Sequence, residues 1–248
     1  MKIVGIIQAR INSSRLPRKV MLKLGPKIVL DHVVSRLKEC KTLNEVVVAT
    51  SINKMDDEIV SWCSQNKTLV FRGSENDVLD RYWKAMNFYN ADVVVRITAD
   101  CPLIDPEIVD QVVKGFLDGN YDGYALGGNF PDGLDCQVFS LNAITKAWNE
   151  AIMPSDREHV GSYIENTNPS AFNLGTLELF NNLESHRWTL DEQNDYDFLK
   201  KVVSGLYVEK SNFRTQDILK FLSKHPELIN INNNIKRNEG YWKQRNNE

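Results

Sequence analysis

The chain of 248 residues lacks long hydrophobic runs, disulfide-type cysteine pairs and zinc-ligand patterns. Its apolar runs are strand length, far short of the about 20 residues that a bilayer-spanning helix needs. The cysteines are widely separated with no CxxC pair, and no histidine stands at ligand spacing from them. We therefore predict no membrane span, no zinc site and buried, reduced thiols at Cys40, Cys63, Cys101 and Cys136.

An excess of charge of one sign is also missing. Lys and Arg number 30, Asp and Glu number 33, and the net charge is −3. This balance favours neither nucleic acid nor an anionic membrane as a partner. With 42% hydrophobic and 25% charged residues, the composition is that of an ordinary globular protein. Met1 leads directly into an apolar strand pattern, so we expect no signal peptide and a cytoplasmic protein.

Glycine-rich phosphate loops are absent after the first apolar segment, where neither GxxxxGK followed by Ser or Thr nor GxGxxG occurs. Residues 2–8 (KIVGIIQ) read as a buried parallel strand. The next loop carries four cations, Arg10, Arg15, Arg18 and Lys19. Open α/β sheets bind ligands at this edge, and a nucleoside triphosphate is the simplest polyanion that would need such a loop. The alternative is that the four cations bind no ligand and are simply solvated by water, as most runs of charge are.

The first half of the chain alternates strand and helix patterns. Strands are predicted at residues 45–49, 68–71 and 92–97, and helices at 28–40, 56–65, 78–87 and 106–117. Repeated β-α units with short connections predict an α/β fold, with a mostly parallel sheet and helices on both faces.

This regularity ends after Tyr124. We predict that residues 125–185 leave the sheet as an insertion with a turn-rich loop (127–133), a strand (136–139) and helices (141–151 and 155–166). Residues 188–190 should return to the sheet before helices at 192–204 and 215–224. The predicted core is thus 1–124 with 186–225, and residues 226–248 should form a loosely packed tail.

Two aspartates stand at predicted strand ends. Asp100 follows the strand at 92–97 and so shares a sheet edge with the cationic loop. Mg²⁺ commonly takes one or two carboxylates together with substrate phosphates. A helix cap or loop carboxylate is the alternative for Asp100. From the residues alone, Asp191 could simply be the N-cap of the helix that follows it.

The loop sequence ARINSSRLPRKVM (residues 9–21) contains A-R-x-x-S-x-R-L-P-x-K. It resembles the signature of the cytidylyltransferases that activate acidic sugars, such as the acylneuraminate and 3-deoxy-manno-octulosonate enzymes, and in particular their spore coat polysaccharide branch. The resemblance extends to about Ser204. It implies a Rossmann-like fold of the nucleotide-diphospho-sugar transferase type, CTP as a substrate and Mg²⁺ as the cofactor. Arg18 departs from the family, which often has glycine there.

The resemblance also implies roles for individual residues. Asp100 and Asp191 would bind the metal, and with Arg10 and Lys19 they would form the catalytic set. The expected nucleotide-binding residues are Ala9, Arg10, Ser14, Arg15, Lys19, Thr50, Ser51, Arg72, Ser74 and Arg81. The expected acceptor-binding residues are Asp135, Gln137, Arg157, His159 and Arg187. An ion-pair network at a subunit interface is the alternative for Arg157 and Glu158.

The implied reaction joins CTP to an acidic sugar and releases pyrophosphate. A sugar or polyol phosphate or a phosphonate is an alternative acceptor. A GT-A-type glycosyltransferase is an alternative class, but its usual D-x-D is absent because Cys101 and Pro102 follow Asp100. A non-catalytic protein would be expected to have lost a metal aspartate or a loop cation, and none is missing.

Assembly is predicted from the apolar content of residues 125–185. A small flap cannot cover all of these side chains, and large apolar patches are rarely left exposed. We therefore expect a two-fold homodimer. The resemblance implies that this region also places residues near the partner's sugar pocket, so Arg157 or His159 is expected to reach the partner's site. The side chains concerned are Val138, Phe139, Leu141, Ile144, Trp148, Val160, Tyr163 and Ile164.

Overall fold

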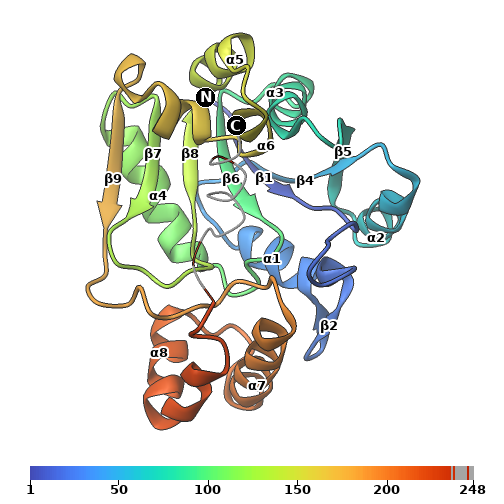
Figure 1. Cartoon of the computed structure of the whole chain (residues 1–248), viewed down its shortest axis with the longest axis vertical. Helices are drawn as coiled ribbons and strands as arrows, with labels where there is room; N and C mark the ends of the chain where they lie inside the picture. Colours follow the sequence, from blue (N-terminus) through green and yellow to red (C-terminus); the bar gives the residue numbers. More distant parts are fainter. Residues whose placement is uncertain (236, 238–244, 246–248) are drawn as a thin grey trace.

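The computed structural model describes residues 1–235, 237 and 245, and a seven-stranded sheet runs through it (Figure 1). The strand order is β5-β4-β1-β6-β8-β7-β9. The strands are β1 (Ile3–Gln8), β4 (Glu45–Ser51), β5 (Leu69–Gly73), β6 (Val93–Thr98), β7 (Gly123–Gly127), β8 (Gln137–Ser140) and β9 (Leu174–Glu178). A separate hairpin joins β2 (Lys23–Leu24) and β3 (Lys27–Ile28).

Helices cover both faces of the sheet. The α-helices are α1 (Val29–Leu37), α2 (Asp57–Gln65), α3 (Val78–Phe88), α4 (Pro106–Asp118), α5 (Leu141–Glu150), α6 (Pro154–Glu158), α7 (Gln193–Glu209) and α8 (Thr215–Lys224). Shorter turns are η1 (Lys19–Met21), η2 (Lys54–Asp56), the π-helical η3 (Tyr163–Thr167), η4 (Pro169–Ala171) and η5 (Pro226–Ile231). In Figure 1, α7 and α8 lie side by side at one end of the molecule.

The parallel half of the sheet confirms the predicted fold class. Strand β1 pairs in parallel with β4 and β6, and β4 pairs in parallel with β5. Ile3 and Ile7 of β1 face one apolar core with α1, α4 and α7, whereas Val4 and Ile6 face a second core with α3 and α5. Both faces of β1 are therefore buried, which explains its unbroken apolar sequence.

The prediction that residues 125–185 leave the sheet is wrong for the strands of this segment. Strand β8 pairs antiparallel with β6 and β7, and β7 pairs in parallel with β9, so all three extend the main sheet. Neither β7 nor β9 was predicted. The sequence of β9 (LGTLE) contains a glycine and is partly exposed, so it lacks a clear strand pattern. The roles of the segment in acceptor binding and dimerisation stay predictions.

The predicted strand at 188–190 is also wrong as a member of the sheet. Only an isolated bridge between Asp132 and Arg187 forms there. Trp188 and Leu190 are fully buried, which explains the strand-like pattern. Their backbone amides instead donate to Asp132 O (2.6 Å) and Asp100 O (2.8 Å). This segment thus links two loops at the carboxyl edge of the sheet.

The predicted helix at 155–166 is divided in two. Helix α6 ends at Glu158, and the π-helical turn η3 begins at Tyr163. Gly161 lies between them, where an added Cβ would come within 2.9 Å of Gln137 Nε2. Close packing of this connection against β8 therefore interrupts the helix.

Most of the apolar side chains that motivated the homodimer are covered within one protomer, and only Leu141 and Trp148 are partly exposed. Val138, Phe139, Ile144, Val160 and Ile164 are each 0% exposed. The argument that they need a partner subunit to cover them is therefore wrong, because the sheet and its helices already bury them. The homodimer itself stays a prediction.

The C-terminal segment is more closely packed than predicted as far as it is described. Leu228 in η5 is buried, and Asn232 donates to Arg187 O (3.0 Å) and Asp195 Oδ1 (2.9 Å). Polar side-chain anchors of this kind leave little hydrophobic signal in the sequence. The remaining positions of the predicted tail, 236, 238–244 and 246–248, lie outside the described residues. Among the described helices, none is long and apolar enough to cross a membrane.

Candidate active site

A cleft of about 860 Å³ opens at the carboxyl edge of the parallel strands. One side is formed by the loop after β1, including Arg10, Arg15 and Lys19. Its opposite side is formed by β8 and the segment around η3, including Gln137 and Glu165. The cleft lies where an open α/β sheet is expected to bind its ligands.

Lys19 connects the two aspartates that the sequence singled out. Its Nζ lies 2.7 Å from Asp100 Oδ2 and 2.8 Å from Asp191 Oδ1. Arg15 Nη2 lies 3.0 Å from Asp191 Oδ1. The three central side chains are 14%, 23% and 19% exposed, in the order Lys19, Asp100 and Asp191. The predicted catalytic cations and carboxylates thus meet in one partly buried cluster.

The ionisation of this cluster follows from its charges. Burial disfavours the charged form of Lys19, but Asp100 and Asp191 outweigh this effect and raise the pKa of its ammonium group. Burial likewise opposes ionisation of Asp100, yet Lys19 lowers the pKa of that carboxyl to about 2. Lys19 and Asp100 are therefore charged at neutral pH.

Local structure positions each member of the cluster. Arg18 adopts a left-handed conformation (φ 58°) directly before η1, and its amide donates to Ile11 O (3.2 Å). This turn folds the loop back on itself at Lys19. Asp100 lies two residues after the end of β6, and the bond from Leu190 N to Asp100 O holds Asp191 beside it.

Arg187 and Asp195 hold Asp191 in position through an ion pair and a backbone hydrogen bond. Arg187 is 6% exposed and contacts Asp132 Oδ2 (2.7 Å), Asp195 Oδ1 (2.9 Å) and Asp191 Oδ2 (3.2 Å). Asp195 is fully buried and also accepts from the amides of Asp191 and Glu192, each at 2.9 Å. Arg187 was predicted to bind the acceptor. It lines the cleft, but three carboxylates already engage its guanidinium.

We expect Asp195→Ala to lower the free energy of unfolding by about 3 kcal/mol, because it leaves buried Arg187 without one of its three carboxylate partners. Asp197→Ala on the same helix is the matched control, since the Asp197 bond to Gln193 is exposed. Denaturant unfolding of both variants measures the difference. Equal stability of the two would contradict the structural role of Asp195.

The predicted nucleotide-binding residues fall into three groups. Ala9, Arg10, Ser14, Arg15, Lys19 and Arg81 line the cleft. Thr50 and Ser51 are buried, and the Ser51 hydroxyl donates to Asp56 Oδ2 (2.5 Å). Asp56 in turn accepts from Ile11 N (2.7 Å) and so anchors the cationic loop. Contact of any of these residues with a nucleotide stays a prediction.

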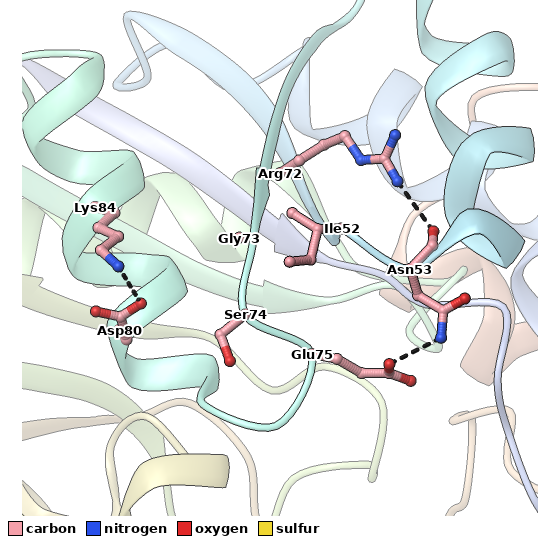
Figure 2. A pocket seen from close by; sticks show the side chains of 8 residues that line it. All are labelled: Ile52, Asn53, Arg72, Gly73, Ser74, Glu75, Asp80 and Lys84. Carbon is pink, nitrogen blue, oxygen red and sulfur yellow. Dashed lines mark hydrogen bonds and ion pairs between the residues drawn. The ribbon is translucent and has the colours of Figure 1, made fainter.

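Arg72 and Ser74 line a second, neighbouring groove (Figure 2). Arg72 donates to Ser51 O and Asn53 O, each at 3.0 Å, and pairs with Asp57 Oδ1 (2.6 Å). Its guanidinium therefore ties the ends of β4 and β5 together. The structure does not bring Arg72 or Ser74 into the large cleft.

The predicted acceptor-binding residues mostly come together. Asp135, Gln137, His159 and Arg187 line the cleft, whereas Arg157 does not. Arg157 Nε donates to Asp77 Oδ2 (2.9 Å) and its Nη1 donates to Trp148 O (2.7 Å), which join α6 to α3 and α5. The proposed reach of Arg157 into a partner's site stays a prediction.

Sequence reasoning missed three residues of this side, Arg96, Glu165 and Arg237, all of which line the cleft. Arg237 pairs with Asp135 Oδ1 (2.6 Å) and its guanidinium lies 4.1 Å from the Phe130 ring centre. A charged residue inside the apolar strand β6 was a usable signal for Arg96. Glu165 and Arg237 had no such signal, because only long-range packing brings them here.

The donor set fits Mg²⁺ in part. Asp100 and Asp191 both lie within hydrogen-bond distance of one ammonium nitrogen, so their oxygens converge on the space of a single cation. Within residues 1–235, 237 and 245, no group of three or more His, Cys, Asp or Glu side chains could hold a metal ion. Two carboxylates with phosphate oxygens completing the coordination is a common arrangement for Mg²⁺.

The fold and the cleft together define a nucleotidyltransferase of the Rossmann-like α/β type. A sequence profile described as cytidylyltransferase matches residues 4–225, and the chain belongs to this family. It is therefore an enzyme, a CTP-dependent nucleotidyltransferase, as the motif at residues 9–21 predicted.

Individual relatives span nearly the whole chain. An uncharacterized protein of Methanocaldococcus jannaschii is 42% identical over 96% of this chain and 97% of its own length. The spore coat polysaccharide biosynthesis protein SpsF of Bacillus subtilis is 32% identical over 91% and 95%. A cytidylyltransferase structure from Leptospira borgpetersenii is 34% identical, with a TM-score of 0.89 over 96% of this chain and 100% of that one.

Proposed function

We propose that this protein transfers the CMP group of CTP to an acidic sugar, giving a CMP-sugar and pyrophosphate. The observation that carries the proposal is the cluster of Lys19, Asp100 and Asp191 beside the cationic loop, in a cleft with a second polar side. A triphosphate and a second substrate can thus lie on either side of one pair of carboxylates.

The acidic acceptor is supported by relatives and by charge. A 3-deoxy-manno-octulosonate cytidylyltransferase of Solibacter usitatus is 35% identical over 45% of this chain and 44% of its own length. Arg96, which pairs with the β8 side of the cleft, forms no ion pair among the described residues, whereas Asp135 compensates the charge of Arg237. A neutral acceptor would not need positive charge on that side.

The chain's own residues would work mainly by positioning and charge. Arg10, Arg15 and Lys19 would bind the triphosphate and offset the charge that develops on pyrophosphate as it leaves. In this reaction Lys19 would exchange its carboxylate contacts in part for phosphate oxygens. Asp195 and Arg187 would hold Asp191 in place.

Asp100 and Asp191 would hold Mg²⁺, which would neutralise phosphate charge and acidify the attacking hydroxyl. No side chain is assigned as a general base. The two carboxylates would set the orientation of the α-phosphate relative to the acceptor, because both approach the same point in the cleft.

Pyrophosphate release tests the proposal. The four nucleoside triphosphates are each combined with a panel of 2-keto-3-deoxy sugar acids, sialic acids, sugar phosphates and polyol phosphates. We expect release only with CTP and a sugar acid, together with a CMP-sugar detected by mass spectrometry. Release with a sugar phosphate and with none of the acids would contradict the acidic acceptor but not the nucleotidyltransferase class.

A further inference from the structure

Arg96 is a cation without a carboxylate partner on the acceptor side of the cleft. It lies on β6 directly opposite Gln137 of β8, and its Nη1 donates to Gln137 Oε1 (2.5 Å). Among the described residues, Arg96 forms no ion pair, and its buried Nε has no hydrogen-bond partner. A half-buried guanidinium whose charge has no counter-ion raises the free energy of the protein unless an anion binds to it.

Gln137 separates Arg96 from the nearest acid. Its Nε2 donates to Glu165 Oε2 (2.5 Å), so the order of contacts is Arg96, Gln137 and Glu165. The neutral amide thus receives from the cation and donates to the acid. A direct Arg96–Glu165 pair would satisfy both charges internally, whereas this relay leaves the guanidinium able to bind an anion.

The backbone on this side is shaped around the relay. An added Cβ at Gly161 would lie 2.9 Å from Gln137 Nε2 and 3.0 Å from Glu165 Oε2. Glu165 belongs to the π-helical turn η3, a conformation that is rare and frequent at functional sites. The glycine and the turn together hold Glu165 against Gln137, which fixes the amide orientation that Arg96 requires.

The position of Arg96 separates it from the triphosphate cations. Arg10, Arg15 and Lys19 come from the loop after β1, whereas Arg96 contacts the β8 side of the cleft. A planar guanidinium matches a carboxylate with two parallel hydrogen bonds. A carboxylate is also the group that distinguishes every sugar acid from a neutral sugar.

We infer that Arg96 binds the carboxylate of the acidic acceptor and sets the preference of the enzyme for acids, with Gln137 and Glu165 as positioning residues. This inference rests on the proposed function, since it assigns the acceptor's acidic group to one side chain. Arg237, paired with Asp135, has its charge already compensated and is not the primary carboxylate ligand.

Steady-state kinetics with matched substrates test this assignment. The probe is the sugar acid of the panel that wild type uses best, compared with its primary carboxamide, which has the same shape without the charge. For Arg96→Gln we expect the acceptor KM to rise about 30-fold or more, because one partner of a desolvated charge pair is lost. The KM for CTP should stay within about twofold, and the preference for acid over amide should largely disappear.

Two further variants distinguish recognition from structure. Arg96→Lys keeps the charge but loses the two-pronged geometry, so its acceptor KM should rise less than that of Arg96→Gln. Lys146→Gln on α5 is the charge control, since Lys146 pairs with exposed Glu150 on the same helix. If Arg96→Gln fails to fold, Arg96→Lys still decides, because an unchanged acceptor KM in that variant would overturn the inference.

Failure of the Arg96 inference and failure of the proposed function give different experimental results. If wild type uses a sugar acid and both Arg96 variants keep its acceptor KM and its preference for acid over amide, this inference is overturned and the proposed function stands. If wild type releases pyrophosphate with none of the acids, the proposed acceptor class is overturned, and the carboxylate assignment of Arg96 falls with it.

Discussion

Asp100→Asn and Asp191→Asn are each expected to fold normally and to lose about 100-fold or more in turnover. Both carboxylates contact Lys19 in the centre of the cleft, and Asp100 is ionised because Lys19 lowers its pKa to about 2. Asparagine has nearly the same shape but supplies no negative charge to hold a divalent cation. Pyrophosphate release at saturating CTP and acceptor over a range of Mg²⁺ concentrations measures the effect.

Asp118→Asn is the control for these two variants, because Asp118 is exposed at the end of α4. Its turnover should equal that of wild type. Rates near wild type for both cluster variants at saturating Mg²⁺ would remove Asp100 and Asp191 from the metal site.

Lys19→Ala is expected to weaken CTP binding about tenfold or more while leaving CMP binding within about twofold. Lys19 is a mostly buried cation of the loop after β1, where the β- and γ-phosphates should lie. CMP lacks those two phosphates, so its affinity should not change when the Lys19 side chain is removed. Arg15→Ala should act in the same direction, with a smaller effect because its side chain is 45% exposed.

Arg18→Gln provides the matched comparison within the same loop. Arg18 pairs with Glu58 of α2 (2.7 Å) and does not line the cleft. Calorimetric titration of each variant with CTP and with CMP separates the contributions. Equal losses of affinity for the two nucleotides in Lys19→Ala would locate Lys19 at the base or ribose rather than at the terminal phosphates.

The parallel half of the fold was predictable because its signals are local. Strand β1 is apolar on both faces, and Pro106 and the acidic first turn of α2 mark helix starts. Such patterns need no knowledge of distant residues. The same applies to Asp100, since a carboxylate directly after a buried strand can only stand at the ligand-binding edge.

The second half resisted prediction where long-range contacts compete with local pattern. Residues 188–190 are apolar like a strand, yet their amides bond to loops at Asp132 and Asp100. The segment 125–185 was predicted to be an insertion because its many turn residues obscured the strand patterns of β7 and β9. These two strands form the edge of the sheet opposite β5. Most of the segment's apolar side chains then proved to be buried within the protomer.

The amino-acid sequence by itself determined the fold class, the cytidylyltransferase family and the approximate place of Lys19, Asp100 and Asp191, because each depends on a contiguous motif or on local strand and helix patterns. Only the tertiary structure decided that Lys19 contacts both aspartates. The same holds for the chain of hydrogen bonds from Arg96 to Gln137 and from Gln137 to Glu165 at the cleft. These contacts join residues 28 to 172 positions apart, and no local periodicity records such a distance.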